Sequence, residues 1–79
     1  MKYRITDKGI EDIKNNRIEY NKPNVSSKIM KFLSSGVSYN IESVLNIVAL
    51  DTRLKANNKI VRDVLNDLCS REFVERVDV

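Results

Sequence analysis

The sequence predicts a mostly helical fold with a small two-stranded antiparallel β-ribbon. Residues 2–6 alternate polar and apolar side chains, which is the pattern of a half-buried strand. Residues 73–79 are rich in β-branched and aromatic side chains, which favour strands. Four stretches between them repeat apolar residues at helical spacing, so the predicted order is β-α-α-α-α-β. Because one strand alone leaves its backbone groups unpaired, we expect the N- and C-terminal strands to pair with each other and to pack on the helices.

The helices are predicted from their caps and their apolar stripes. Their ranges are residues 7–17, 25–35, 41–49 and 58–70. The residues expected to cap them are Thr6 or Asp7, then Asn24, then Asn40, and finally Asn57 or Asn58. Gly36 supplies the stop after the second helix, whereas Asn15 and Asn16 indicate fraying near the end of the first. The apolar stripe of the last helix, which must face the core, comprises Ile60, Val61, Val64, Leu65 and Leu68.

The chain is long enough for a single domain over residues 1–79 with one core. Of its 79 residues, 42% are hydrophobic. No apolar run approaches the roughly 18 residues of a membrane helix, and the charged N-terminal stretch does not resemble a secretory signal. A single cysteine, Cys69, cannot form an internal disulfide. We therefore expect an intracellular protein of the cytoplasm, or of the host cytoplasm if its source is a virus.

The composition argues against catalysis. The chain has no histidine, so the side chain that most often serves as an acid or base near neutral pH is missing. It has no Cys/His cluster for zinc, and its two glycines are too few for a phosphate-binding loop. We therefore expect no enzyme, no cofactor and no metal site.

The basic residues are distributed unevenly along the chain. The net charge is only +3, but two windows contain no acidic residue. Residues 20–41 include Lys22, Lys28 and Lys31, and residues 52–62 include Arg53, Lys55, Lys59 and Arg62. These windows either form a phosphate-binding face or are ordinary solvated surfaces, and charge alone favours the solvated surface.

Two segments resemble parts of one family. The helix that carries Leu65 and Leu68, followed by Phe73-Val74-Glu75-Arg76, resembles the recognition helix and first wing strand of winged helix-turn-helix proteins. The segment Tyr3-Arg4-Ile5-Thr6-Asp7-Lys8-Gly9 resembles the second wing strand and final helix of MarR-, PadR- and ArsR-like regulators, where Tyr-x-Leu-Thr-x-x-Gly is common. In those proteins the second segment follows the first, whereas here it comes first. The chain thus resembles a circularly permuted winged helix, and this order agrees with the expected pairing of the end strands.

The chain departs from the family pattern at the wing. Glu72 stands where the family usually has glycine at the turn into the wing, and a non-glycine residue held there at positive φ is strained. The end of the wing would consist of Met1, Lys2, Asp78 and Val79 rather than a closed tip. A wing that reaches into the minor groove is therefore not expected.

The resemblance implies a small transcriptional regulator that binds double-stranded DNA, with the helix at 58–70 in the major groove. It would have no effector pocket, because the short chain leaves no room for a sensing domain. Arg62 and Asn66 are the expected base-reading residues, since Arg and Asn make bidentate contacts with guanine and adenine. The other expected DNA contacts are Asn58 and Lys59 at the helix start, Arg53 and Lys55 in the preceding turn, Lys28 and Lys31 on the second helix, and Lys2 and Arg4 on the wing.

A second function remains open, in which the domain binds a protein partner without binding DNA. Asp63 and Asp67 would repel phosphates, and capping alone explains Asn58. Lys59 and Asp63 lie one turn apart and can simply pair on a solvated surface.

A homodimer is also open. It would form either through the helix at 7–17 or through a strand swap of residues 2–6. The residues available on and after that helix are Ile10, Ile13, Ile18 and Tyr20.

Overall fold

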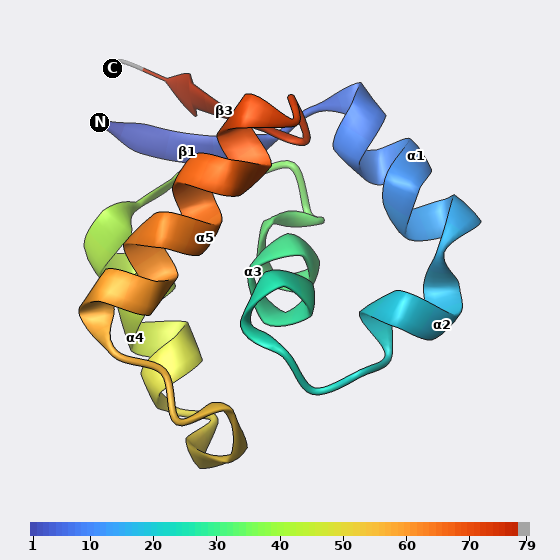
Figure 1. Ribbon diagram of the computed structural model, residues 1–79. Coiled ribbons are helices and arrows are strands. Elements are labelled where there is room, and N and C mark those ends of the chain that lie inside the picture. Colours follow the sequence, from blue (N-terminus) through green and yellow to red (C-terminus); the bar gives the residue numbers. More distant parts are fainter. Residues whose placement is uncertain (78–79) are drawn as a thin grey trace.

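The first and last strands of the chain pair with each other, as the sequence predicted. β1 (Lys2–Ile5) runs antiparallel to β3 (Val74–Val77), with Lys2 opposite Val77 and Ile5 opposite Val74. The computed structural model describes residues 1–77, so the last two residues of the predicted strand 73–79 lie outside the described part. Figure 1 shows the start of β1 beside β3, at the upper end of the helices.

The sheet within residues 1–77 has a third strand, so the prediction of a two-stranded ribbon was wrong. β2 (Tyr39–Asn40) pairs antiparallel with the other edge of β1, which gives the strand order β2-β1-β3. Two residues are too few to show an alternating pattern, so the sequence offered no local signal for this strand. Its position depends on nonlocal contacts, because it pairs with Lys2 and Tyr3 near the start of the chain, and the Tyr39 ring also packs on Phe32 with 4.3 Å between ring centroids.

A group of helices lies against one face of the sheet and supplies most of the core. Its members are α3 (Val25–Leu33), α4 (Ile41–Ala49) and α5 (Asn58–Ser70), with a short 3-10 turn, η1 (Thr52–Leu54), between α4 and α5. Asn24, Asn40 and Asn57 cap these helices by accepting a hydrogen bond from the backbone N–H three residues later. The predicted starts of all three helices are therefore confirmed.

Two predicted helices are shorter than expected. α3 ends at Leu33 rather than at residue 35. The predicted helix 7–17 breaks at Asn16, whose φ of −129° and ψ of 44° leave the helical region, and it becomes α1 (Asp7–Asn15) and α2 (Arg17–Tyr20). The Asn16 amide donates to the carbonyl and the carboxylate of Asp12, which is a local alternative to the next helical turn.

The segment formed by α1 and α2 packs on the core, so it offers little of the surface expected for a dimer. Tyr20 is 8% exposed, and Ile10 and Ile13 are partly buried against the core. Of the four residues expected at a dimer contact, Ile18 is the exposed one, at 79%.

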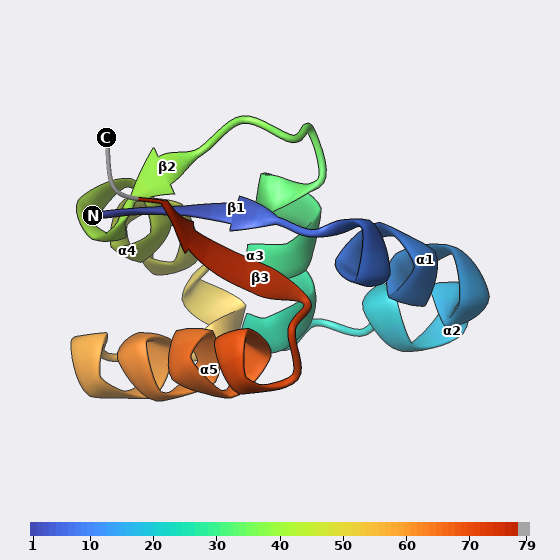
Figure 2. The same cartoon turned by 90° about the horizontal axis from the view of Figure 1, so that it is seen from above.

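The core lies between the sheet and the three helices below it. Its buried side chains are Ile29, Met30 and Leu33 on α3, Val44 and Val48 on α4, Val61, Leu65 and Leu68 on α5, Tyr3, Ile5 and Val74 on the sheet, and Tyr20 at the end of α2. This packing fixes which side of α5 faces solvent. Figure 2 shows α5 at the edge of the molecule. No helix within residues 1–77 is long and apolar enough to cross a bilayer.

A joint of hydrogen bonds ties the start of α1 to the turn between α5 and β3. The Thr6 N–H donates to the Phe73 carbonyl at 3.0 Å, and the Thr6 hydroxyl donates to the Glu72 carbonyl at 2.6 Å. The same hydroxyl oxygen accepts from the Gly9 N–H at 3.0 Å and so caps α1. The two backbone segments approach so closely that a Cβ on Gly9 would lie 2.3 Å from the Phe73 carbonyl oxygen. Position 9 therefore requires glycine.

The turn into β3 contains a residue in the left-handed conformation, which favours glycine. Glu72 has a φ of 66°. Its N–H donates to the Cys69 carbonyl, and the Phe73 N–H donates to the Leu68 carbonyl, which together end α5 in a Schellman motif. The turn thus holds a non-glycine residue in a conformation that carries a steric penalty.

We expect Gly9→Ala to lower the free energy of unfolding by about 1–3 kcal/mol, because the new methyl group must displace the Phe73 carbonyl. The net loss is expected even though alanine in a helix is usually more stable than glycine by roughly 1 kcal/mol. Glu11→Ala, an exposed change in the same helix, is the control and should stay within about 0.5 kcal/mol of the wild type. Urea denaturation measures both. Equal stability of Gly9→Ala and the wild type would contradict the close contact.

We expect Glu72→Gly to raise the free energy of unfolding by about 0.5–1 kcal/mol, because it removes the steric cost of a positive φ. Glu72→Ala is the matched control, since it also removes the carboxylate but keeps the Cβ. Thermal and urea denaturation of both variants should show a gain for glycine alone. A gain of the same size for alanine would assign the effect to the charge of Glu72 instead.

Candidate nucleic-acid interface

The exposed side of α5 is the candidate interface. α4, η1 and α5 follow one another as helix, turn and helix, and α5 lies on the outside of the molecule (Figure 2). The buried stripe of Val61, Leu65 and Leu68 turns the opposite side of α5 toward solvent. At about 100° per residue, the polar residues of that side divide into two flanks that differ in charge.

The first flank, here called the amide–arginine flank, carries Asn58, Arg62 and Asn66. These residues follow one another at intervals of four and are all exposed. Arg62 makes no ion pair or side-chain hydrogen bond with another residue among 1–77, so its guanidinium donors point into solvent. The Asn66 side-chain oxygen accepts a hydrogen bond from Arg76 Nη2 at 2.9 Å, which leaves the NH2 group of Asn66 available.

Arg76 is a residue of this surface that the sequence reasoning did not select. It lies on β3 opposite Tyr3, so its side chain starts from the sheet face that covers the helices. From there it reaches Asn66 and adds a positive charge beside the amide–arginine flank. The strand alternation was the available signal, because Arg76 shares a face with the buried Val74.

The second flank of α5 is acidic and lines a cleft. Asp63 pairs with Lys59 at 3.5 Å, and Asp67 pairs with Arg71 at 3.0 Å. Together with residues of α1 and α2, the two acids line a cleft of about 710 Å³. The sequence predicted no effector pocket from chain length, yet this cleft falls in the size range of small-molecule sites. The carboxylates of Asp63 and Asp67 make this flank of α5 less favourable for anions than the amide–arginine flank.

Tyr20 lines the same cleft and is held by an acid. Its hydroxyl donates to the Asp12 carboxylate. Burial, followed by the hydrogen bond and the charge of Asp12, raises the pKa of Tyr20 well above its ordinary value. Tyr20 therefore stays a neutral donor and holds α2 to α1.

A second hollow, here called the α3–η1 pocket, gathers several of the predicted phosphate contacts. It has a volume of about 170 Å³, and its lining among residues 1–77 includes no residue of α5. Its basic side chains are Lys28 and Lys31 on α3, Arg53 on η1, and Lys22 in the loop before α3. Lys22 belongs to an acid-free window of the sequence but was not among the predicted contacts.

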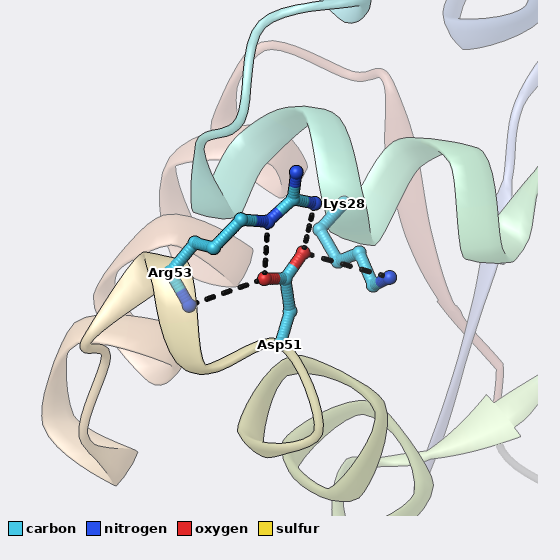
Figure 3. Close-up of polar contacts among 3 residues, drawn as sticks. All are labelled: Lys28, Asp51 and Arg53. Atoms are coloured by element: carbon cyan, nitrogen blue, oxygen red, sulfur yellow. Dashed lines mark hydrogen bonds and ion pairs between the residues drawn. The ribbon is translucent and has the colours of Figure 1, made fainter.

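Asp51 organises the α3–η1 pocket (Figure 3). Its side chain is 9% exposed, and its two oxygens accept from Arg53 Nε at 2.9 Å and Nη2 at 2.8 Å. Lys28 Nζ lies 3.9 Å from the same carboxylate. The hydrogen bond from Arg53 outweighs the opposing effect of burial and, with the charges of Arg53 and Lys28, lowers the pKa of Asp51 from 3.8 to about 2. Sequence reasoning missed Asp51 because its partners come together only in the fold.

The two predicted contacts on the wing lie elsewhere. Lys2 and Arg4 are exposed on the sheet face that points away from the helices, because Tyr3 and Ile5 point into the core. Arg4 is paired with Glu75 across the strands.

The ten predicted contacts therefore fall on separate surfaces. Asn58, Lys59, Arg62 and Asn66 share the exposed side of α5, and Lys28, Lys31 and Arg53 share the α3–η1 pocket. Lys2 and Arg4 lie on the outer face of the sheet, and Lys55 has a left-handed backbone just after η1. Within residues 1–77 no group of three or more His, Cys, Asp or Glu side chains could hold a metal ion.

We expect Asp51→Asn to make the free energy of unfolding depend less on pH in the acid range. The folded-state pKa of Asp51 is lowered, so its contribution is fully present above the ordinary pKa of 3.8 and is lost as the pH falls toward about 2. Urea denaturation from pH 6 to pH 2 should show the wild type more stable at pH 6, with the difference vanishing near pH 2. Glu42→Gln removes an exposed carboxylate for comparison. A constant difference between wild type and Asp51→Asn across this range would contradict the ionic role of Asp51.

Comparison with family models, curated proteins and solved structures finds no match for this chain.

Proposed function

We propose that this protein binds double-stranded DNA as a winged helix-turn-helix domain in permuted order, with α5 in the major groove. The observation that carries this proposal is the amide–arginine flank. Arg62 and Asn66 are exposed on a helix whose other side is fixed in the core, and their donors face solvent. Arg and Asn are the side chains that make bidentate contacts with guanine and adenine edges in that groove.

The sheet supports the same proposal. β2 lies between α3 and α4 and adds a third strand to the sheet of the two expected wing strands. The strand order β2-β1-β3 places β3, and with it Arg76, on the side of the sheet nearer α5 (Figure 2). A wing strand beside the recognition helix is the arrangement that the resemblance implies.

The ion pairs of α5 leave room for phosphate contacts. The Lys59 side chain is 85% exposed, and its pair with Asp63 is long, at 3.5 Å. Exposed pairs of this kind are worth about 0–1 kcal/mol, so Lys59 can exchange Asp63 for a phosphate at small cost. Arg53 and Lys55 precede α5 and would add contacts to the DNA backbone near its start.

The role in transcription follows from the resemblance. A domain of this size that binds DNA at a defined site acts by occupying that site or by recruiting another protein to it. Two copies on a palindromic site would double the phosphate contacts.

The acidic flank of α5 favours a second candidate function. Asp63 and Asp67 line a cleft, although each is also paired with an exposed basic side chain, and Ile60 beside them is 41% exposed. In this second function the same helix contacts a protein partner, and DNA is not bound. The two functions differ in their salt dependence, because only contacts with phosphates release condensed counterions.

We expect the protein to bind duplexes enriched from a random pool, with log Kd rising linearly with log salt between about 50 and 200 mM. On the enriched duplex, Arg62→Ala should weaken binding by about 1–3 kcal/mol and relax the sequence preference at one position. Fluorescence anisotropy of the labelled duplex measures the affinity, and repeated enrichment with the variant measures the preference.

Arg17→Ala is the matched control, because it removes an exposed arginine of α2 and changes the net charge equally. Its affinity should stay within about twofold of the wild type. Equal losses in the two variants would mean that net charge, not the amide–arginine flank, binds the DNA. Absence of duplex binding at low salt by the folded protein would overturn the proposal and leave the protein-binding function.

A further inference from the structure

We propose that the α3–η1 pocket binds a single phosphate group, at a site separate from α5. Its basic side chains come from three segments, of which η1 is far from the other two in sequence: Lys22 in the loop after α2, Lys28 and Lys31 on α3, and Arg53 on η1. The fold directs four positive charges to one hollow, which concentrates the potential for an anion.

The acidic groups near the pocket leave a positive excess. Among residues 1–77, Asp51 is the one acidic residue of its lining, and Glu19 pairs with Lys22 at 3.1 Å from outside the lining. Two carboxylates thus stand against four basic side chains. Asp51 is nearly buried and has both oxygens occupied by Arg53, so it presents little negative charge to an entering anion.

Asp51 also holds the principal donor in place. It accepts from Nε and Nη2 of Arg53, which leaves the guanidinium with further N–H groups for a second oxyanion. A guanidinium fixed in this way loses less side-chain entropy on binding. Lys31 contributes a nearly unengaged ammonium group, because its contact with the Asn21 side chain is 3.5 Å long.

The size of the pocket selects the ligand. Its volume is about 170 Å³, which corresponds to the liquid volume of roughly five or six water molecules. This is below the roughly 300–1,000 Å³ of sites for drug-sized ligands, so the pocket suits one tetrahedral oxyanion group rather than a whole nucleotide. Phosphate, with charged oxygens in several directions, matches donors that converge from three segments.

The phosphate group has two possible sources. It is either a phosphodiester of a nucleic-acid backbone that crosses this side of the protein, or a free phosphate or the phosphate of a small molecule. The proposal does not depend on α5, because no residue of α5 is among the described lining of the pocket.

The first test is a titration of the whole protein with inorganic phosphate, followed by amide NMR at constant ionic strength set with sodium chloride. We expect saturable shifts of the amides that line the pocket. Lys31→Gln should raise the Kd for phosphate about tenfold, the effect of losing one charge-assisted contact. Lys14→Gln, an equal change on the exposed surface of α1, should leave the Kd within about twofold. Shifts that do not saturate, or an equal effect of both variants, would overturn the proposal.

The second test identifies the source by measuring duplex binding of Lys31→Gln against salt. If the DNA backbone supplies the phosphate, the slope of log K against log salt should fall by about 0.9 and inorganic phosphate should compete with the duplex. If the duplex slope is unchanged while Lys31→Gln still weakens phosphate binding, the site serves a free phosphate group. Either result supports the pocket, and Arg62→Ala tests α5 separately, so failure of one proposal is distinguishable from failure of the other.

Discussion

The antiparallel pairing of β1 with β3 is the constraint on which the rest of the structure depends. It joins the two ends of the chain, and the Thr6 joint at its inner end fixes α1 against the turn after α5. Because β3 follows α5 directly, this pairing also sets the position of α5 beneath the sheet. This joint constrains the backbone on both sides. Gly9 lies too close to the Phe73 carbonyl for a side chain, and Glu72 has a positive φ.

The distribution of charged side chains over the surfaces of the protein matters more than its net charge. α5 has an acidic flank toward the cleft and an amide–arginine flank toward solvent and β3, although the helix itself has no large net charge. In the α3–η1 pocket the nearly buried Asp51 sets the position of Arg53 and is shielded by it. In both places the acids are engaged by neighbouring bases, so the modest net charge of +3 conceals surfaces that can meet phosphate.

The exposed side of α5 and the α3–η1 pocket are different parts of the molecule and offer different kinds of contact. α5 offers side chains with a defined hydrogen-bonding pattern on one helix face, which suits the edges of bases. The α3–η1 pocket offers converging positive charge without such a pattern, which suits a phosphate group. A protein with both features would separate recognition of sequence from attachment to the backbone.

The sequence by itself determined the elements whose causes are local. The three asparagine caps, the spans 41–49 and 58–70, and the strand character of both chain ends depend on residues within one or two turns of each element. Tertiary structure decided what depends on distant partners. The strand at Tyr39 forms because β1 lies beside it, and Arg76 joins the α5 surface because β3 folds back over the helix. Lys28 of α3 and Arg53 of η1 come together because both pair with Asp51. Each of these contacts joins two different elements, and no pattern within one element encodes which other element it will meet.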